Sequence, residues 1–354
     1  MKSPYRLFAR LLFLALFLFV ILAFQQSGIA WDEQWHLEYG RLLLDYYRGI
    51  PPVEPELSAL TYRNLVIYGG AFDLSAELFN RLLGRLLPLG AIELRHLFTG
   101  LVGLLGVAGA WLAARRLAGE RAAFWSALLL ALCPGYFGHL FFNPKDLPFA
   151  VAYIWGLYAL LRLLNGPVRS AWRDWLLFGL VAGLALGVRV GGVFLFGWAC
   201  LVLAWNAWRA RRKTGRLDLR SLLQFSAAGL LAYAVMLACW PWAQQAPLRN
   251  PLEALQRMSN FNFPYEVLYN GAFISAIDLP RAYLPHYLLL TLPELLLVLL
   301  AIGAGLELWQ ATRFLRAKQP PSTAFAGGLL LLLASLLPAG FAIWIGSTLY
   351  DGTR

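Results

Sequence analysis

The sequence predicts an all-α polytopic membrane protein, a helix bundle with about nine spans and amphipathic helices in its first outer loop. Of the 354 residues, 60% are hydrophobic and 14% are charged, and the mean hydropathy is +0.60. An average soluble domain is about a quarter charged, so the low charge indicates a lipid environment. The hydrophobic residues come in blocks long enough to cross roughly 30 Å of hydrocarbon as helices. Basic residues gather in the short loops between these blocks.

The predicted spans are the apolar blocks themselves. They cover residues 8–25, 94–114, 122–142, 147–164, 175–189, 191–208, 222–240, 284–306 and 324–346. The first block also has features of a secretory signal peptide, because "SGIA" is an acceptable cleavage site. Its length and the many spans behind it favour an uncleaved signal anchor.

The basic residues predict the orientation of the spans. With a cytoplasmic N-terminus, most of the 30 Lys and Arg residues fall in short cytoplasmic segments, as the positive-inside rule requires. The net charge of +11 is therefore a topology signal, and nucleic-acid binding is not indicated. These basic residues are Lys2, Arg6, Arg10, Arg115, Arg116, Arg121, Arg162, Arg169, Arg173, Arg209, Arg211, Arg212, Lys213, Arg216, Arg220, Arg313, Arg316 and Lys318.

In this orientation the long loops face the outside. Segments 26–93 and 241–283 and the short turn "FFNPKDLP" carry most of the acidic residues. Two amphipathic helices are expected in the first loop, at 35–48 and 72–87, where they would lie along the membrane interface. The polar stripe of the second helix is Asp73, Glu77, Arg81 and Arg85.

The chain is predicted to form one membrane domain over residues 1–354. Repeats of 20–50 residues are not visible in it. The three cysteines lie inside apolar spans with neither metal-site spacing nor a disulfide framework, which indicates small core residues.

The stretch "GIAWDEQWHLEYG" places two carboxylates, Asp32 and Glu33, directly after the first span. Both could simply be solvated, or could cap the amphipathic helix that follows, since carboxylates are favourable at helix N-termini. Alternatively one of them faces a substrate, because a carboxylate at the rim of an apolar site can act as a general base.

Two further outer positions carry cations. In "NPKD", Asn143, Pro144 and Asp146 make a good helix start, but Lys145 is unfavourable at a helix N-terminus unless an anion binds there. Arg189 in "LALGVRVGG" either snorkels to the interface or, with glycines leaving room beside it, meets a phosphate headgroup.

The last outer segment is rich in aromatic residues, Asn and Pro, as a loop over a sugar would be. Tyr283 and His286 lie where the next span starts, a depth at which aromatic residues are common anyway. Glu294 falls inside that predicted span, and an intramembrane acid indicates either function or a local hydrogen bond after Pro293.

Three functions fit a polytopic protein with this outer face. An enzyme that uses a lipid-linked phosphate accounts for the acids and the two outer cations. A transporter or lipid flippase should show polar residues or broken helices at paired positions in its spans, whereas these spans contain almost no polar residues. A non-catalytic membrane scaffold accounts for the spans but gives no reason for Lys145.

The order of the motifs resembles the polyprenyl-phosphate-dependent glycosyltransferases of the GT-C fold. This group includes protein O-mannosyltransferases and lipid A aminoarabinose transferases. The matching segments are "WDEQWHLEYG", "FFNPKDLPFA", "GVRVGG", "WPW" with "NPLEAL", "YLPHYLLLTLPELLL" and "LYDGTR". The resemblance covers nearly the whole chain and implies that further spans follow Arg354.

The resemblance implies an inverting transfer of a sugar from a polyprenyl phosphate to an acceptor outside the cytoplasm. Asp32 would deprotonate the acceptor hydroxyl, Glu33 would help to place the acceptor, and Asp146 would be a second acid near the donor. Lys145 and Arg189 would hold the donor phosphate. Further substrate contacts are expected from His36, Tyr68, Tyr283 and His286.

The implied location is the plasma membrane, the inner membrane of a bacterium, with the active face outside. The partners would be the lipid-linked sugar, membrane lipids and a lipid, glycan or protein acceptor. Some members of the wider fold use a divalent metal; the sequence contains no dedicated ligand cluster, and the need for a metal stays open, as does the choice of sugar.

Overall fold

The structure is a computed structural model that describes residues 3–164, 172–215, 219–259, 261, 263, 265–317 and 320–349. The predicted cytoplasmic residues Lys2, Arg169, Arg216 and Lys318 lie outside these ranges, as does most of "LYDGTR". The chain forms two compact units. Unit 1 comprises Met1–Leu132 and Tyr136–Pro251, and unit 2 comprises Cys133–Gly135 and Leu252–Arg354.

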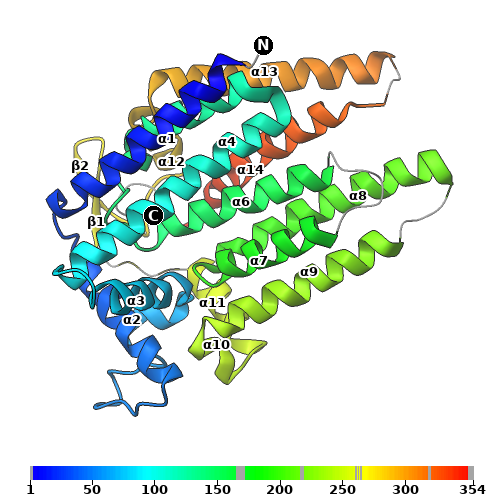
Figure 1. The fold of residues 1–354 in the computed structure, drawn as a ribbon. Coiled ribbons are helices and arrows are strands. Elements are labelled where there is room, and N and C mark those ends of the chain that lie inside the picture. The colour runs from blue at the N-terminus through cyan, green and yellow to red at the C-terminus, as the bar shows by residue number, and fades with distance from the viewer. Residues whose placement is uncertain are drawn as a thin grey trace. The chain divides into compact units, whose positions relative to one another are not determined.

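Unit 1 is helical (Figure 1). Its α-helices are α1 (Pro4–Ala23), α2 (Glu33–Tyr47), α3 (Ala71–Leu83), α4 (Ala91–Ala131), α6 (Asp146–Leu164), α7 (Trp172–Leu186), α8 (Phe194–Thr214), α9 (Leu219–Ala238) and α10 (Pro241–Gln245). Three short 3₁₀ helices are η1 (Phe24–Gln26), η2 (Arg63–Ile67) and η3 (Val190–Val193). The short helix α5 (Pro134–Phe137) and helix α11 (Arg249–Ser259) fall at the borders between the units.

Within the part of the chain that the structure describes, seven helical segments are long and apolar enough to cross a membrane, which confirms the all-α polytopic class. They are Pro4–Gln26, Ala91–Ala131, Asp146–Leu164, Val190–Arg212, Leu219–Ala238, Glu294–Arg316 and Thr323–Ile345. Every one of the nine predicted spans overlaps a helix, but those at 122–142 and 284–306 differ in form from the prediction.

Helix α4 contains two of the predicted spans. It has 41 residues, and Gly119 interrupts it with a φ of 82°. The hydroxyl of Tyr136 donates to the carbonyl of Gly103 at 2.6 Å, although a straight helix would separate these residues by about 50 Å. The chain therefore reverses near Gly119, between the predicted spans 94–114 and 122–142, as their prediction as two separate spans requires. The second helical arm ends at Ala131, before the predicted end at residue 142.

Helix α7 is as long as the span predicted at 175–189 but begins and ends three residues earlier. Its 15 residues extend about 22 Å, less than the roughly 30 Å of a bilayer core. Trp175 and Phe178 are fully buried. A Cβ atom on Gly183 would lie 2.6 Å from the carbonyl oxygen of Ala232, so α7 packs backbone to backbone against α9. One face of α7 is therefore packed inside the unit, while Leu176, Leu180 and Leu184 on the opposite face are exposed.

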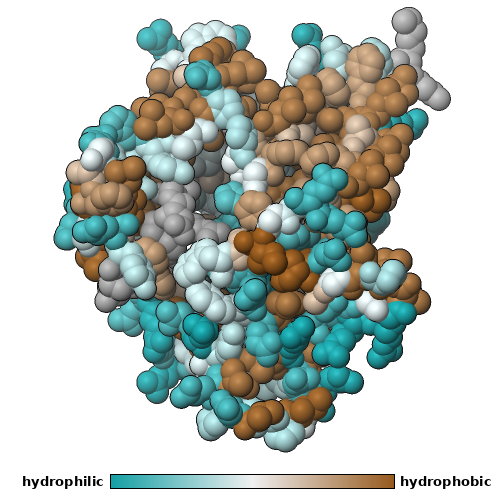
Figure 2. Space-filling view, turned by 90° about the vertical axis from the view of Figure 1, so that its left-hand side faces the viewer, coloured by the Kyte–Doolittle hydropathy of each residue, from teal (hydrophilic) through white to brown (hydrophobic). Residues whose placement is uncertain are grey.

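Helices α2 and α3 confirm the amphipathic segments of the first outer loop, with one correction. Asp73 and Glu77 were expected on a polar stripe, but both are buried, because α3 turns its acidic residues toward α2 and α4. In Figure 2 hydrophilic residues are most frequent in the lower part of the face, at the height where Figure 1 draws the segment after α2.

Unit 2 contains an antiparallel hairpin and three helices. Strands β1 (Glu266–Tyr269) and β2 (Ala272–Ser275) pair Tyr269 with Ala272. The turn between them is Asn270-Gly271, and both residues have a positive φ, as a two-residue hairpin turn needs. The helices are α12 (Tyr283–Thr291), α13 (Glu294–Ala317) and α14 (Thr323–Ile345).

The span predicted at 284–306 is broken in unit 2. Helix α12 ends at Thr291 and α13 begins at Glu294, because Pro293 cannot continue the hydrogen-bond ladder. Glu294 therefore lies in the first turn of α13 and not in the middle of a span. This position corrects the expectation of an acid inside the membrane.

Candidate functional site

The loop that carries Tyr68 is fixed at two points. Trp240, which is fully buried, donates from Nε1 to the carbonyl oxygen of Val66 at 2.7 Å. The backbone N–H of Ala71 donates to the carbonyl of Gly187 at 2.9 Å. The loop after η2 is thereby held against the turn that leads from α7 to Arg189.

The start of α6 is also rigid. The side chain of Asn143 accepts from the backbone N–H of Lys145 at 3.2 Å and of Asp146 at 2.8 Å, and its amide donates to Asp146 Oδ2 at 3.1 Å. The predicted cap is therefore present, with α6 beginning at Asp146, two residues later than Pro144. This cap holds Lys145 in a fixed turn.

These elements bring four predicted residues together, and we call Tyr68, Lys145, Asp146 and Arg189 the rim cluster. Lys145 Nζ lies 4.7 Å and Arg189 Cζ 5.7 Å from the centroid of the Tyr68 ring, within cation–π range. A guanidinium nitrogen of Arg189 lies 3.0 Å from Asp146 Oδ1. The two cations thus share one aromatic ring, and only Arg189 is paired with the carboxylate.

The rim cluster leaves positive charge unbalanced. Lys145 is only 8% exposed, yet its ammonium pairs with no carboxylate among the described residues. The Nε atom of Arg189 is buried and has no hydrogen-bond partner within the described ranges. A buried cation is costly unless it is paired, so the cluster is suited to an anion between Lys145 and Arg189.

An apolar cavity of about 280 Å³ lies next to the rim cluster. Ala71 and Val188 belong to its lining, and they are close in the chain to Tyr68 and Arg189. The remaining lining residues come from α3, α4, α6 and α7: Phe72, Ser75, Phe98, Val102, Leu105, Pro148, Val151, Ala152, Trp155, Val181 and Leu184. Unit 1 therefore places a hydrocarbon-lined space beside a site for an anion.

The two carboxylates after α1 have different surroundings. Asp32 precedes α2, is largely buried, and makes no side-chain capping bond to that helix. Glu33 is 1% exposed, accepts the backbone N–H of Ala30 at 2.7 Å, and lies 2.9 Å from His96 Nε2. Both oxygens of Glu33 are engaged, so it closes the turn before α2 and ties it to α4.

His36 lies in an adjoining group of buried charges. Its Nδ1 is 2.9 Å from Asp73 Oδ2, and Arg95 bonds to the other oxygen of Asp73. Burial raises the pKa of Asp73, but His36 and Arg95 lower it by more, so the pKa lies below its ordinary value. We call this set the buried network: Glu33, His36, Asp73, Arg95 and His96.

Asp73 was predicted only as part of a polar stripe, and no role was predicted for Arg95 or His96. Arg95 and His96 lay at the start of a predicted span, where ionisable residues call for a partner, and this signal could have identified them. The network joins α2, α3 and α4. It includes His36, which was expected to contact a substrate.

Tyr283 and His286 belong to unit 2. The Tyr269 hydroxyl and His286 Nδ1 are 3.2 Å apart, and the rings of Tyr269 and Tyr283 are 5.4 Å apart. They form an aromatic cluster between the hairpin and α12. Such a cluster can stack on a sugar, as the sequence analysis expected of these two residues.

Within the described ranges, no three His, Cys, Asp or Glu side chains are grouped so that they could hold a metal ion.

Residues 91–242 match the family model for dolichyl-phosphate-mannose-protein mannosyltransferase. The matched region runs from the start of α4 through the segment "WPW" and contains Lys145, Asp146 and Arg189. The resemblance to the glycosyltransferases of the GT-C fold is confirmed over this region. The match favours a glycosyltransferase over a transporter or a scaffold.

A solved structure is also similar, that of the S. cerevisiae protein O-mannosyltransferase Pmt1-Pmt2 complex bound to the sugar donor. The identity is 16% and the TM-score 0.49, over 71% of this chain and 35% of that chain. This chain thus spans about a third of the length of that relative. No curated protein matches the sequence.

Proposed function

We propose that the chain is a membrane glycosyltransferase that moves a sugar from a polyprenyl-phosphate donor to an acceptor hydroxyl. The match of residues 91–242 to the mannosyltransferase family supports the class of enzyme. The observation that carries the proposal is the pair of incompletely balanced cations, Lys145 and Arg189, beside an apolar cavity.

The donor has a charged and an apolar end, and the site offers a complement to each. The phosphate binds between Lys145 and Arg189, where the ammonium and the unpaired Nε of Arg189 supply charge-assisted hydrogen bonds. The first isoprene units occupy the cavity of about 280 Å³. Asp146 acts through its ion pair with Arg189 and is a positioning residue.

The transfer is a single inverting displacement. The acceptor oxygen attacks the anomeric carbon of the sugar and forms the new glycosidic bond, while the bond from that carbon to the phosphate oxygen breaks. The electron pair leaves with the polyprenyl phosphate, whose charge Lys145 and Arg189 stabilise. The acceptor proton passes to the carboxylate of Asp32.

Glu33 serves this reaction by fixing Asp32. Its carboxylate closes the turn from Ala30 and holds the N-terminus of α2 to His96 on α4. This role replaces direct contact with the acceptor, because the two oxygens of Glu33 are already bonded.

The proposed location keeps the N-terminus in the cytoplasm and the rim cluster outside, in the plasma membrane or a bacterial inner membrane. Arg6 and Arg115 both pair with Glu120, which gathers the start of α1 and the bend of α4 at one end of the unit. Under the positive-inside rule this basic end faces the cytoplasm.

The test uses membranes that contain the full chain or the Asp32→Asn variant. A panel of polyprenyl-phosphate sugars is offered together with a serine- and threonine-containing peptide, a lipid or a glycan as acceptor. Release of free polyprenyl phosphate is then followed. Removal of the base should lower turnover by roughly 10²–10⁴-fold at unchanged protein level.

The matched control is Glu38→Gln, which removes an exposed carboxylate from α2 and should leave turnover unchanged. Turnover that survives Asp32→Asn would keep the enzyme class and reject Asp32 as the base. Absence of turnover with every donor and acceptor combination would reject the proposed function. The acceptor that supports release identifies whether a protein, a lipid or a glycan is glycosylated.

A further inference from the structure

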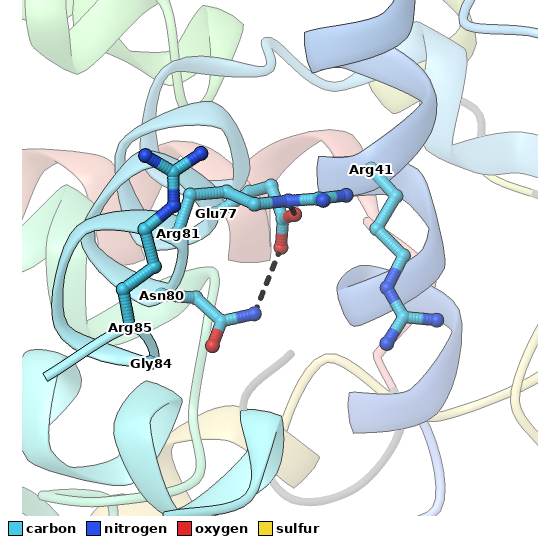
Figure 3. Close-up of a pocket in the computed structure, with 6 residues that line it drawn as sticks. All are labelled: Arg41, Glu77, Asn80, Arg81, Gly84 and Arg85. Carbon is cyan, nitrogen blue, oxygen red and sulfur yellow. Dashed lines mark hydrogen bonds and ion pairs between the residues drawn. The ribbon is translucent and has the colours of Figure 1, made fainter. Parts of the chain in front are cut away.

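A second charged cavity, of about 510 Å³, lies between α2 and α3 of unit 1, apart from the rim cluster. Three arginines, one carboxylate and one amide line it: Arg41, Glu77, Asn80, Arg81 and Arg85, with Gly84 (Figure 3). Its volume falls within the roughly 300–1,000 Å³ of typical small-molecule sites. The proposed sugar transfer makes no use of it.

Close packing of the two helices brings the arginines together. A Cβ atom on Gly40 would lie 2.7 Å from the carbonyl oxygen of Asp73, so α2 and α3 touch at this glycine. The next residue, Arg41, therefore stands opposite the C-terminal half of α3. In Figure 3 the Arg81 side chain extends toward α2 and ends near the start of the Arg41 side chain, whose guanidinium lies below it, while the Arg85 guanidinium lies on the far side of Arg81.

The carboxylate in the cavity is saturated. Glu77 is 2% exposed, and it accepts from Arg81 Nε at 2.6 Å and from Asn80 Nδ2 at 3.2 Å. It therefore balances Arg81 but neither of the other two guanidinium groups.

Arg41 and Arg85 keep most of their charge available. Arg41 pairs with Glu38 at 3.3 Å, but both side chains are about 40% exposed, and such surface pairs are weak. Arg85 has no hydrogen bond or ion pair with any other described residue. The three guanidinium groups that line this space repel each other, and an anion between them would relieve the repulsion.

The helix dipole alone does not account for the three arginines. Cations are favourable at a helix C-terminus, which explains Arg81 and Arg85 at the end of α3. Arg41, however, lies in the middle of α2 and points into the same cavity. The convergence therefore comes from two helices and not from one helix end.

We propose that this cavity binds a phosphate-bearing anion at the membrane interface. Guanidinium groups match phosphate oxygens with paired hydrogen bonds, and Arg41, Arg81 and Arg85 offer several such groups around one centre. Helices α2 and α3 are amphipathic and lie in the chain between the spans α1 and α4. Such helices lie at the level of the lipid headgroups. The phosphate belongs either to an anionic phospholipid or to a free phosphate.

The experiment measures binding to the purified full chain in detergent by native mass spectrometry, with phosphatidylglycerol, net-neutral phosphatidylcholine and inorganic phosphate as probes. The test variant is Arg41→Gln with Arg85→Gln. Arg48→Gln is the matched control, because Arg48 ends α2 as an exposed arginine that does not line the cavity. Loss of each charge-assisted contact should weaken phosphatidylglycerol binding by about 10-fold or more.

Weaker binding of phosphatidylglycerol alone in the double variant identifies a lipid headgroup, and weaker binding of inorganic phosphate as well identifies a general phosphate site. Phosphatidylcholine binding should not change. Equal binding by wild type and double variant, or an equal loss in Arg48→Gln, would overturn the proposal. If the double variant does not fold, Arg85→Gln alone decides the question, because Arg85 supports no contact whose loss would unfold the chain.

Discussion

The buried network and the rim cluster of unit 1 contain the same kinds of residue, but the first stabilises the fold and the second is available to bind a ligand. Each contains carboxylates within bonding distance of cationic or imidazole groups. In the buried network Glu33 and Asp73 have partners on both oxygens, and every member is buried. In the rim cluster Lys145 lacks a carboxylate partner among the described residues, and Arg189 keeps an unbonded Nε.

This difference separates charged residues that stabilise the fold from charged residues that are available to bind a ligand. In the buried network the carboxylates are fully bonded, although Arg95 Nε and His36 Nε2 are, like Arg189 Nε, without a hydrogen-bond partner among the described residues. Removing Asp73 costs much, because it leaves the buried Arg95 without its counter-charge. A cluster with spare donors gains when a phosphate arrives, and its members can be changed with little loss of stability.

The largest expected effect is that of Asp73→Ala. It leaves Arg95 buried without its carboxylate and should lower the free energy of unfolding by about 3–5 kcal/mol. The measurement is thermal or denaturant unfolding in detergent, with the exposed Glu56→Ala as control. A loss no greater than in the control would show that the buried network does not stabilise the fold and would remove the contrast with the rim cluster.

A smaller effect, on binding and not on stability, is expected for Arg189. Arg189→Gln should weaken binding of the polyprenyl-phosphate donor by about 10-fold or more, since hydrogen bonds to charged groups contribute about 1.5–3 kcal/mol. Arg189→Lys keeps the charge but loses the planar fork, so it should recover only part of the affinity. The KM for the donor and the unfolding temperature are measured together, and a large fall in stability with unchanged KM would reverse the assignment.

The smallest expected effect is a pH dependence of the buried network. Because the pKa of Asp73 is lowered in the folded protein, its contribution is complete above the ordinary carboxyl range and is lost as the pH falls through the folded pKa. The stability difference between wild type and Asp73→Asn should therefore shrink as the solution is acidified. A difference that stays constant with pH would mean that the carboxylate charge of Asp73 adds nothing.

Much of the fold follows from the apolar blocks and the charges between them. Each predicted span overlaps a helix because length and hydropathy determine which segments can be helices in lipid. The close packing of α7 against α9 could not be read in the same way. It depends on glycine contacts between residues that are distant in the chain.

The candidate site was predicted in part. Lys145, Asp146 and Arg189 stood out because cations near a helix start and a glycine-rich turn are unusual outside the cytoplasmic loops. The role of Glu33 was less visible, since its partner His96 lies 63 residues further along the chain. Burial of Asp73 and Glu77 could not be predicted from an amphipathic pattern, because the pattern does not say that a charged face meets another charged face.

The contact between Gly69 and the turn before Arg189 has a genetic consequence. A Cβ atom on Gly69 would lie 2.0 Å from the carbonyl oxygen of Gly187, so no other residue fits there while the two loops stay in place. Any side chain at Gly69 would push Tyr68 away from Lys145 and Arg189. In a screen for inactive alleles, this glycine would score like a ligand-binding residue, although it offers no functional group at all.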